Sequence, residues 1–197
     1  MTDFINLILD NPDKEWIWTY ISANPNITMD IVEKYPDLPW KWNKLSKNPS
    51  ISLEYILSNP DKPWDWARVS LNPNLTMDIV NKYPNKPWNW IFLSKNPSIT
   101  YKDVVDNRSY PWEWKYVTQK KDIPFDTIKR YANHPWDWKY ISRRQDITME
   151  LIEKNINLPW DWRDICGSVN VTLDFIKKHQ DKIVEFCDSK YIGIGSI

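Results

Sequence analysis

The side chains of this chain best suited to contact a partner are basic and aromatic residues that recur 24 residues apart. The aromatic ones are Phe92, Tyr116 and Tyr140, and the basic ones include Lys115, Lys139 and Arg163. Basic side chains interleaved with aromatic rings can hold a phosphate backbone while bases stack, or can hold an acidic peptide that carries aromatic anchors. We therefore define a candidate binding face made of Phe92, Lys115, Tyr116, Lys139, Tyr140, Arg143, Arg144 and Arg163.

A structural role for the same residues stays open at this point. The aromatic side chains could pack against the next repeat, and the basic residues could simply keep the surface hydrated, as runs of charge usually do. Between residues 115 and 144 the chain has eight Lys or Arg and three Asp. The local excess of positive charge thus fits either a binding face or a solvated one.

Catalytic, metal and cofactor chemistry has few candidate residues. The histidines are His134 and His179, which other repeats replace with unrelated residues, so we expect solvated histidines at helix ends. The cysteines are Cys166 and Cys187, expected as reduced, partly buried thiols, and four such residues in all are too few for a zinc site or a disulfide framework. The three glycines form no phosphate loop. We expect no enzyme, no metal, no cofactor and no small-molecule substrate.

Composition excludes several other classes of protein. The chain has 26 Lys plus Arg and 26 Asp plus Glu, so its net charge is zero and it lacks the general attraction to nucleic acid of a strongly basic chain. No apolar run is long enough to span a membrane, and the start of the chain does not resemble a signal peptide. We expect an intracellular protein. A hydrophobic content of 42% predicts a folded chain despite 15 prolines.

A strict repeat must position these side chains. All 14 tryptophans fall in W-x-W pairs that recur every 24 residues, from Trp16 and Trp18 to Trp160 and Trp162. We number each repeat from the residue before its first Trp, so that the second repeat runs from Pro39 to Lys62. Positions 7, 13 and 18 are always aliphatic, and position 8 is small. Such self-similarity without insertions predicts one structural unit stacked many times.

Each repeat predicts two short helices. The first should run from the Pro to about position 9, with that Pro in its first turn and an Asp, Asn or Ser two residues earlier as its cap. Because residues two apart on a helix point in different directions, the two Trp should face different neighbours. An Asn-Pro pair such as Asn48-Pro49 should end this helix. The second helix should begin after a capping Ser or Thr at position 14 and end before Pro36, Pro60 or Pro84.

The regularity of the tryptophans favours a structural role over a stacking platform for sugars or bases. We predict a structural core that includes Trp40, Trp42, Trp64, Trp66, Trp88, Trp90, Trp112, Trp114, Trp136 and Trp138. A seven-bladed propeller is excluded because its blades need about 40–45 residues and glycine-rich turns.

The predicted fold is therefore all-α, an α-solenoid of seven 24-residue helix-turn-helix repeats with terminal capping helices. A single repeat domain should cover residues 1–197. Residues 1–14 should form an N-terminal cap, residues 15–182 the repeats, and residues 183–197 a C-terminal cap and tail. Helices of two turns are marginal alone, so stacking between repeats must stabilise them.

The stretch from Pro63 to Thr76, PWDWARVSLNPNLT, resembles the tryptophan-rich repeats found in proteins of giant DNA viruses that infect amoebae. The resemblance covers residues 15–182 and implies the host cytoplasm as location, but no activity. Repeats five to seven depart from it, with Lys120-Lys121, Arg144-Gln145 and Ser168-Val169 in place of Asn-Pro and Pro124 in place of the capping Thr.

The expected function is that of a non-enzymatic scaffold that binds another protein through an extended solenoid surface, since solenoids present such surfaces to partners. The alternative is nucleic-acid binding through the basic and aromatic face of repeats five and six.

Overall fold

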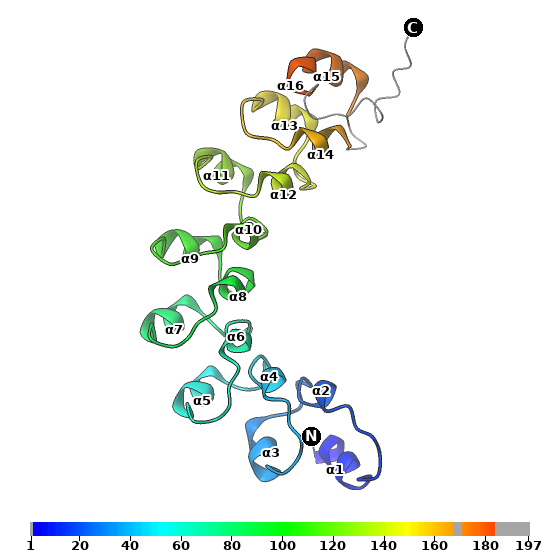
Figure 1. Cartoon of the computed structure of the whole chain (residues 1–197), viewed down its shortest axis with the longest axis vertical. Coiled ribbons are helices and arrows are strands. Elements are labelled where there is room, and N and C mark those ends of the chain that lie inside the picture. The colour runs from blue at the N-terminus through cyan, green and yellow to red at the C-terminus, as the bar shows by residue number, and fades with distance from the viewer. Residues whose placement is uncertain (1, 168–170, 184–197) are drawn as a thin grey trace. The chain divides into compact units, whose positions relative to one another are not determined.

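The computed structural model describes residues 2–167 and 171–183, and within these ranges every regular element is an α-helix (Figure 1). The residues group into two compact units, Met1–Lys120 and Lys121–Ile197. The first unit contains α1 to α10 and the second contains α11 to α16. The prediction of an all-α helical repeat is confirmed. The prediction of one domain stays a prediction, and its C-terminal cap and tail lie outside the described residues except for Ile183.

Two kinds of helix alternate along the chain. The first helices of the repeats are α2 (Trp18–Ile21), α4 (Trp42–Leu45), α6 (Trp66–Val69), α8 (Trp90–Lys95), α10 (Trp114–Val117), α12 (Trp138–Ser142) and α14 (Trp162–Cys166). The second helices are α3 (Met29–Lys34), α5 (Leu53–Ser58), α7 (Met77–Lys82), α9 (Tyr101–Asp106), α11 (Phe125–Arg130), α13 (Met149–Lys154) and α15 (Leu173–Lys178). Outside this alternation stand α1 (Thr2–Leu9) and α16 (Gln180–Ile183).

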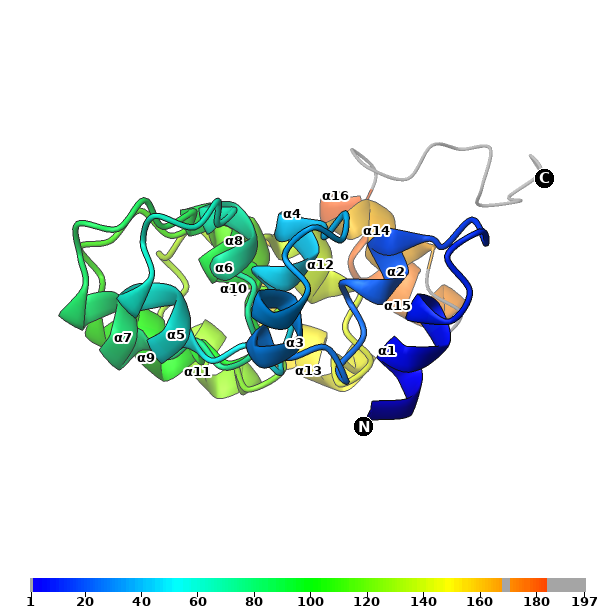
Figure 2. The same cartoon turned by 90° about the horizontal axis from the view of Figure 1, so that it is seen from below.

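The helices of the first unit form two layers. Figures 1 and 2 show α2, α4, α6, α8 and α10 following one another in one row, and α1, α3, α5, α7 and α9 in a second row beside it. In α1, Ile5 and Ile8 are buried at the same spacing as Met29 and Val32 in α3, so α1 has the form of a second helix. In the second unit α12 contacts α14.

The first helix of each repeat begins later than predicted, at the second Trp. The residue between the two Trp is the N-cap of this helix, as Asp65 is for α6. The backbone N–H of Asp65 donates to Ser46 Oγ of the preceding repeat at 2.9 Å. Asp65 Oδ1 accepts from Arg68 N at 3.1 Å and so caps the helix. The placement of Pro in the first turn was therefore wrong. The two Trp meet different neighbours because the first lies in the loop before the helix.

The second helices begin as predicted. Thr28, Ser52, Thr76, Thr100, Thr148 and Thr172 are their N-cap residues. The Ser52 hydroxyl accepts from the Tyr55 N–H at 3.1 Å, whereas Thr28 makes no such side-chain bond. Pro124 stands at the N-cap of α11 without a capping bond, and α11 forms nonetheless.

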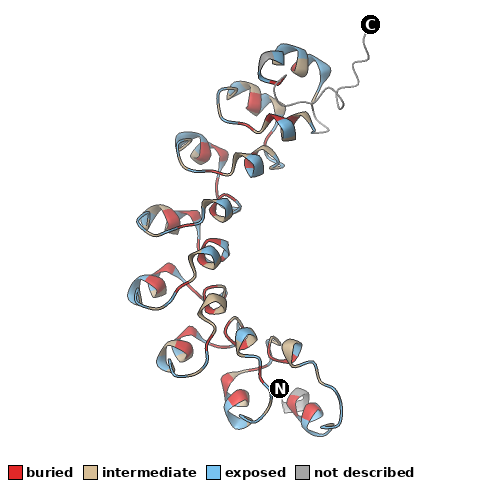
Figure 3. Cartoon of the chain, in the orientation of Figure 1, coloured by how far each residue is buried: buried red, intermediate tan, exposed pale blue. Residues whose placement is uncertain are grey.

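Aliphatic side chains form the core between the two layers. In Figure 3 the buried residues of the first unit gather where the two rows of helices face each other, and exposed residues cover the outer loops. Burying each such side chain stabilises the fold by about 1.5–3 kcal/mol. The large, fully buried ones come from positions 7, 13 and 18: Ile27, Leu45, Ile51, Ile56, Leu75, Leu93, Ile99, Ile123, Ile128, Ile141, Ile152 and Ile165.

Within each unit the tryptophans link a repeat to its neighbour. The first Trp of a pair is buried from the second repeat onward, and its indole N–H bonds the residue that ends the preceding helix: Trp88 Nε1 donates to the Tyr83 carbonyl at 2.9 Å. The second Trp of a pair is half-buried in the second to sixth repeats, as Trp42, Trp66, Trp90, Trp114 and Trp138. It meets the first Trp of the next repeat edge to face, with centroids 5.0–5.4 Å apart, in the pairs Trp18–Trp40, Trp42–Trp64, Trp66–Trp88, Trp90–Trp112 and Trp138–Trp160.

Buried asparagines add a second link between repeats. Asn48 Nδ2 donates to the carbonyls of Ser22 at 3.1 Å and Asn24 at 2.9 Å, both in the preceding repeat. Its Oδ1 accepts from Ser50 N at 2.9 Å and closes the turn. Asn72 and Asn96 make the corresponding bonds. We call the position 10 asparagines, from Asn24 to Asn96, the asparagine ladder. The asparagine thus does more than end the first helix before the Pro, because its amide joins two turns that lie 24–26 residues apart.

Candidate binding surface

Part of the candidate face forms a cation–π stripe in the first unit. The guanidinium of Arg68 lies 5.5 Å from the centroid of the Phe92 ring. The ammonium of Lys95 lies 5.5 Å from that ring and 4.0 Å from the Tyr116 ring. A cation over an aromatic face is attracted to it by about 0.5–1 kcal/mol at exposed sites. We call Arg68, Phe92, Lys95 and Tyr116 the cationic stripe.

The register of the stripe follows from the repeat. Arg68, Phe92 and Tyr116 occupy position 6 of consecutive repeats, and Lys95 occupies position 9, one helical turn after Phe92. Positions 6 and 9 of neighbouring repeats therefore meet. The second unit has the same pairing with different chemistry, since Arg143 Nη2 at position 9 lies 2.7 Å from Asp164 Oδ1 at position 6.

The 24-residue period predicts the position 6 aromatics on one stripe, but Arg68 and Lys95 were not predicted as members of it. The signal was present, because position 9 is one helical turn from position 6 and is Lys or Arg in the second, fourth and sixth repeats. The structure also places the exposed Arg143 in an ion pair with Asp164.

The remaining predicted residues are more open. Lys115, Lys139 and Arg163 at position 5 are exposed, and Tyr140 is 38% exposed. Among the residues that the structure describes, Lys115, Lys139 and Arg163 form no ion pair. Phe92, Lys115 and Tyr116 belong to the first unit, and Lys139, Tyr140, Arg143, Arg144 and Arg163 belong to the second.

Arg144 has a structural place instead of a surface one. It occupies the position of the ladder asparagine, and its side chain is only 16% exposed. Its Nη1 donates to the Ile123 carbonyl at 3.0 Å, and its Nη2 lies 2.6 Å from Asp146 Oδ2. Lys120 Nζ donates to the Asn96 carbonyl at 3.0 Å, which lies 24 residues earlier like an acceptor of the Asn48 amide. Lys120 therefore replaces the asparagine amide in the fifth repeat, whereas Arg144 in the sixth bonds a different carbonyl, that of Ile123.

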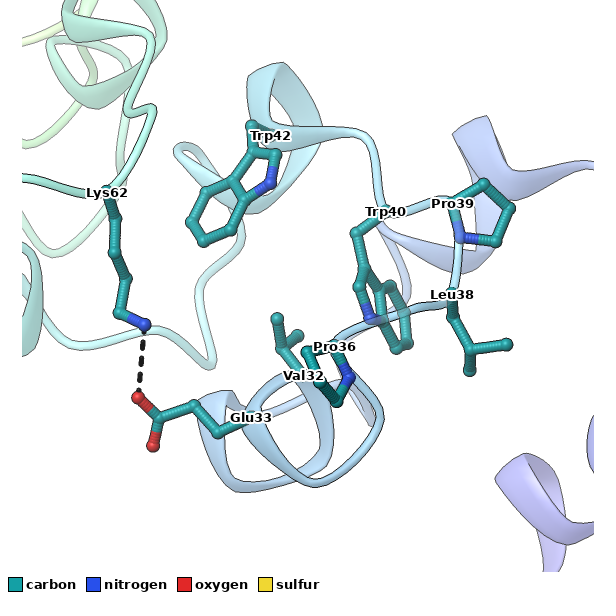
Figure 4. Close-up of a pocket in the computed structure, with 8 residues that line it drawn as sticks. All are labelled: Val32, Glu33, Pro36, Leu38, Pro39, Trp40, Trp42 and Lys62. Atoms are coloured by element: carbon teal, nitrogen blue, oxygen red, sulfur yellow. Dashed lines mark ion pairs between the residues drawn. The ribbon is translucent and has the colours of Figure 1, made fainter.

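A pocket opens beside the half-buried Trp42. Figure 4 shows the indole of Trp42 on one side and Val32 and Pro36 on the other, with the ion pair of Lys62 and Glu33 at the edge. The volume is about 190 Å³. The other residues that line it are Leu38, Pro39 and Trp40. The repeat pattern does not predict this pocket, because the pocket depends on where the Lys62 side chain points.

Glu33 holds the polar edge of the pocket together. Its Oε1 accepts a hydrogen bond from the Tyr55 hydroxyl and lies 3.2 Å from Lys62 Nζ. The Tyr55 hydrogen bond, followed by the Lys62 bond, lowers the pKa of the Glu33 carboxyl. Burial and the bond to Glu33 raise the pKa of the Tyr55 hydroxyl.

Carboxylates with lowered pKa values predict acid sensitivity. The pKa is also lowered for Asp146 by hydrogen bonds from Arg144, for Glu150 by Lys154 and for Glu153 by Lys178. Groups whose pKa falls on folding stabilise the folded state above their unfolded pKa and lose that contribution as the pH drops through the folded pKa. We expect the melting temperature to be constant above about pH 5 and to fall below it. A melting temperature that stays flat or rises down to pH 3 would contradict this.

Neither histidine is solvated as expected, although His179 does lie at a helix end, as the C-cap of α15. His134 is half-buried, with its ring 5.2 Å from Tyr131 and 5.8 Å from Trp136. His179 is also half-buried, and its Nε2 lies 3.3 Å from Glu153 Oε1. Cys166 is disulfide-bonded, so the expectation of a reduced thiol there was wrong, and Cys187 lies outside the described residues.

Among the described residues no group of three or more His, Cys, Asp or Glu could hold a metal ion. None of the described helices combines the length and the apolar character that crossing a membrane requires. No protein family model, no curated protein and no solved structure matches this chain.

Proposed function

We propose that this chain is a non-enzymatic α-solenoid scaffold that binds another protein through the surface of its first helices. The observation that carries the proposal is the cationic stripe, in which Lys95 and Arg68 lie over the rings of Phe92 and Tyr116. Aromatic and Arg side chains are enriched among the residues that contribute most to protein–protein binding. A stripe built at repeat spacing offers an extended partner several equivalent contacts.

The solenoid is supported by how the repeats are joined. Indole pairs, asparagine bonds and backbone N–H bonds to the position 8 hydroxyl of the preceding repeat connect neighbouring repeats. Ser70 shows the pattern, since its Oγ accepts from Asn89 N at 2.9 Å and donates to the Trp66 carbonyl at 2.8 Å. Nearest-neighbour contacts of this kind are typical of solenoids.

A protein partner is favoured over nucleic acid in the first unit. Nucleic-acid binders of this type offer free aromatic faces for bases and free cations for phosphates. Here Lys95 and Arg68 already cover the rings of the stripe, and the chain has no net charge. An acidic segment with apolar side chains could pair with these cations and pack against the ring edges.

Nucleic-acid binding is the second candidate function. The observation that favours it is that Lys139, Tyr140 and Arg163 are exposed and lie in the same unit. Lys139 and Arg163 form no ion pair among the described residues. Binding through phosphates would weaken steeply with salt. Filter binding to single- and double-stranded DNA and RNA across a salt series tests this candidate, and the absence of binding at low salt would eliminate it.

The scaffold proposal is tested by comparing two variants as bait. The double variant Arg68→Ser, Lys95→Ser removes the cations of the stripe, and Lys129→Ser, Arg130→Ser is the matched control, since it removes two exposed cations from α11. We expect a protein captured from the native host to bind the purified wild-type chain and the control directly and to bind the stripe variant at least tenfold more weakly. Equal binding by all three would refute the role of the stripe.

A further inference from the structure

The pocket beside Trp42 has a filled counterpart two repeats later. There Tyr110 stacks on Trp90, with centroids 4.4 Å apart and planes inclined by 28°. The Tyr110 hydroxyl donates to Asn81 Oδ1 at 3.0 Å. Trp90 and Tyr110 occupy positions 4 and 24 of their repeat, and Asn81 occupies position 19 of the preceding one. The same positions hold Trp42, Lys62 and Glu33 at the pocket, so Glu33 stands where Asn81 accepts the phenol.

A third counterpart explains why the pocket is open. In the intervening repeat Lys86 at position 24 lies over the Trp66 ring at 5.2 Å, and position 19 of the preceding repeat is Leu57, whose side chain cannot accept a hydrogen bond. Lys62 has a carboxylate at that position and pairs with it instead, as Figure 4 shows. Glu33 therefore draws the Lys62 ammonium away from the indole and leaves the Trp42 face to line the pocket.

The pocket has the size and the polar group that a phenol needs. An apolar cavity of about 150 Å³ holds benzene, and this pocket has a volume of about 190 Å³. The bonds to Glu33 from Tyr55 and Lys62 both fall on Oε1, so among the described residues Oε2 remains available as an acceptor. Stacked aromatic rings are worth about 0.5–1.5 kcal/mol beyond the area that they bury.

We propose that the pocket formed by Trp42, Val32, Pro36 and Glu33 binds a phenol ring, supplied as a tyrosine side chain by the partner protein. The ring stacks on Trp42 as Tyr110 stacks on Trp90, and its hydroxyl donates to Glu33. A tyrosine within a protein is the source because the charged residues that line the pocket, Glu33 and Lys62, already pair with each other. They leave no pair of opposite charges for the ammonium and carboxylate of a free amino acid. This inference rests on the proposed scaffold function.

The test uses 4-methylphenol, the small-molecule analogue of the tyrosine side chain, and observes the ¹⁹F resonance of Trp42 in protein labelled with 5-fluorotryptophan. Trp42→Phe assigns the resonance. We expect a shift that saturates with a Kd on the order of 1 mM, as for a small ligand of few atoms. Lys62→Tyr, which places a ring on Trp42 as Tyr110 does on Trp90, should weaken binding at least tenfold. Toluene, which lacks the hydroxyl, should bind more weakly than 4-methylphenol.

Tyr110→Ala is the matched positive control, because it empties the counterpart and should create a second site, seen as a shift at Trp90. If Tyr110→Ala binds 4-methylphenol at Trp90 and the wild type shows no shift at Trp42, the proposal fails. It also fails if Lys62→Tyr binds as well as wild type, or if toluene binds equally well.

Binding of two further ligands, N-acetyltyrosinamide and free tyrosine, identifies the source of the phenol ring. N-acetyltyrosinamide should bind at least as tightly as free tyrosine, and tighter binding of free tyrosine would overturn the assignment to a protein side chain. Capture of a partner protein is a separate measurement, so failure of the scaffold proposal and failure of the pocket proposal remain distinguishable.

Discussion

Replacing Trp88 with Ala is expected to lower the free energy of unfolding by about 3–5 kcal/mol, the range for large aromatic side chains removed from a core. Trp88 is 8% exposed, and its ring meets Trp66 edge to face at 5.3 Å. Its Nε1 also bonds the Tyr83 carbonyl, which would lose this donor. The change therefore removes a contact between repeats together with buried area. Urea unfolding followed by circular dichroism at 222 nm measures the loss.

Tyr20→Ala is the control for this measurement. Tyr20 is 74% exposed, so its removal should change the free energy of unfolding by less than about 0.5 kcal/mol. An unchanged urea midpoint for Trp88→Ala would show that the indoles do not join the repeats.

The helical repeat was predictable because its signals are local and occur seven times. Apolar residues at positions 7, 13, 15 and 18 and a hydroxyl at position 14 indicate two short helices, and the structure has them. The start of the first helix was not predictable in this way. Its N-cap is set by a bond from the residue between the two Trp to a hydroxyl 19 residues earlier, as from Asp65 to Ser46. Local propensity carries no information about such a partner.

The asparagines show the same limit. The Asn-Pro pair indicates a break in the helix, which is correct, but burial of the Asn48 amide requires carbonyls of the preceding repeat. Position 10 of repeats five and six is Lys120 and Arg144, which the sequence marks as departures from the pattern. The structure explains them, because both side chains donate to backbone carbonyls. Lys120 bonds the Asn96 carbonyl as an asparagine amide would, whereas Arg144 bonds the Ile123 carbonyl, and local sequence does not indicate that the Arg144 side chain is largely covered.

Only those members of the candidate site that share a position in the 24-residue repeat were predictable from the sequence. Equal position numbers placed Phe92 and Tyr116 on one stripe, and the structure joins them through Lys95. The pocket beside Trp42 cannot be predicted from the repeat pattern, since position 24 is lysine both at the pocket, as Lys62, and in the next repeat, as Lys86. Their side chains differ in direction because the preceding repeat supplies Glu33 in one case and Leu57 in the other.

The asparagine ladder leads to the second large prediction. Asn48→Asp is expected to destabilise the protein by about 3–5 kcal/mol at pH 7, the cost of a buried charge without a partner. Asn48 is 2% exposed, and its Nδ2 donates to the carbonyls of Ser22 and Asn24. A carboxylate would replace this donor with a negative charge facing two carbonyl oxygens. Chemical unfolding at pH 7 measures the effect.

Asn24→Asp is the matched control, because Asn24 begins the ladder: it is half-buried, and its Oδ1 accepts from Asn26 N at 2.9 Å, a bond that a carboxylate keeps. Its cost should stay below about 1 kcal/mol. Burial should raise the pKa of the carboxyl introduced at position 48, so the destabilisation caused by its charge is largest at pH values above that pKa and is lost as the pH falls through it. The difference between Asn48→Asp and wild type should therefore shrink with decreasing pH. Equal losses for the two variants, or a difference that is independent of pH, would show that the amide at position 48 is not buried against the preceding repeat.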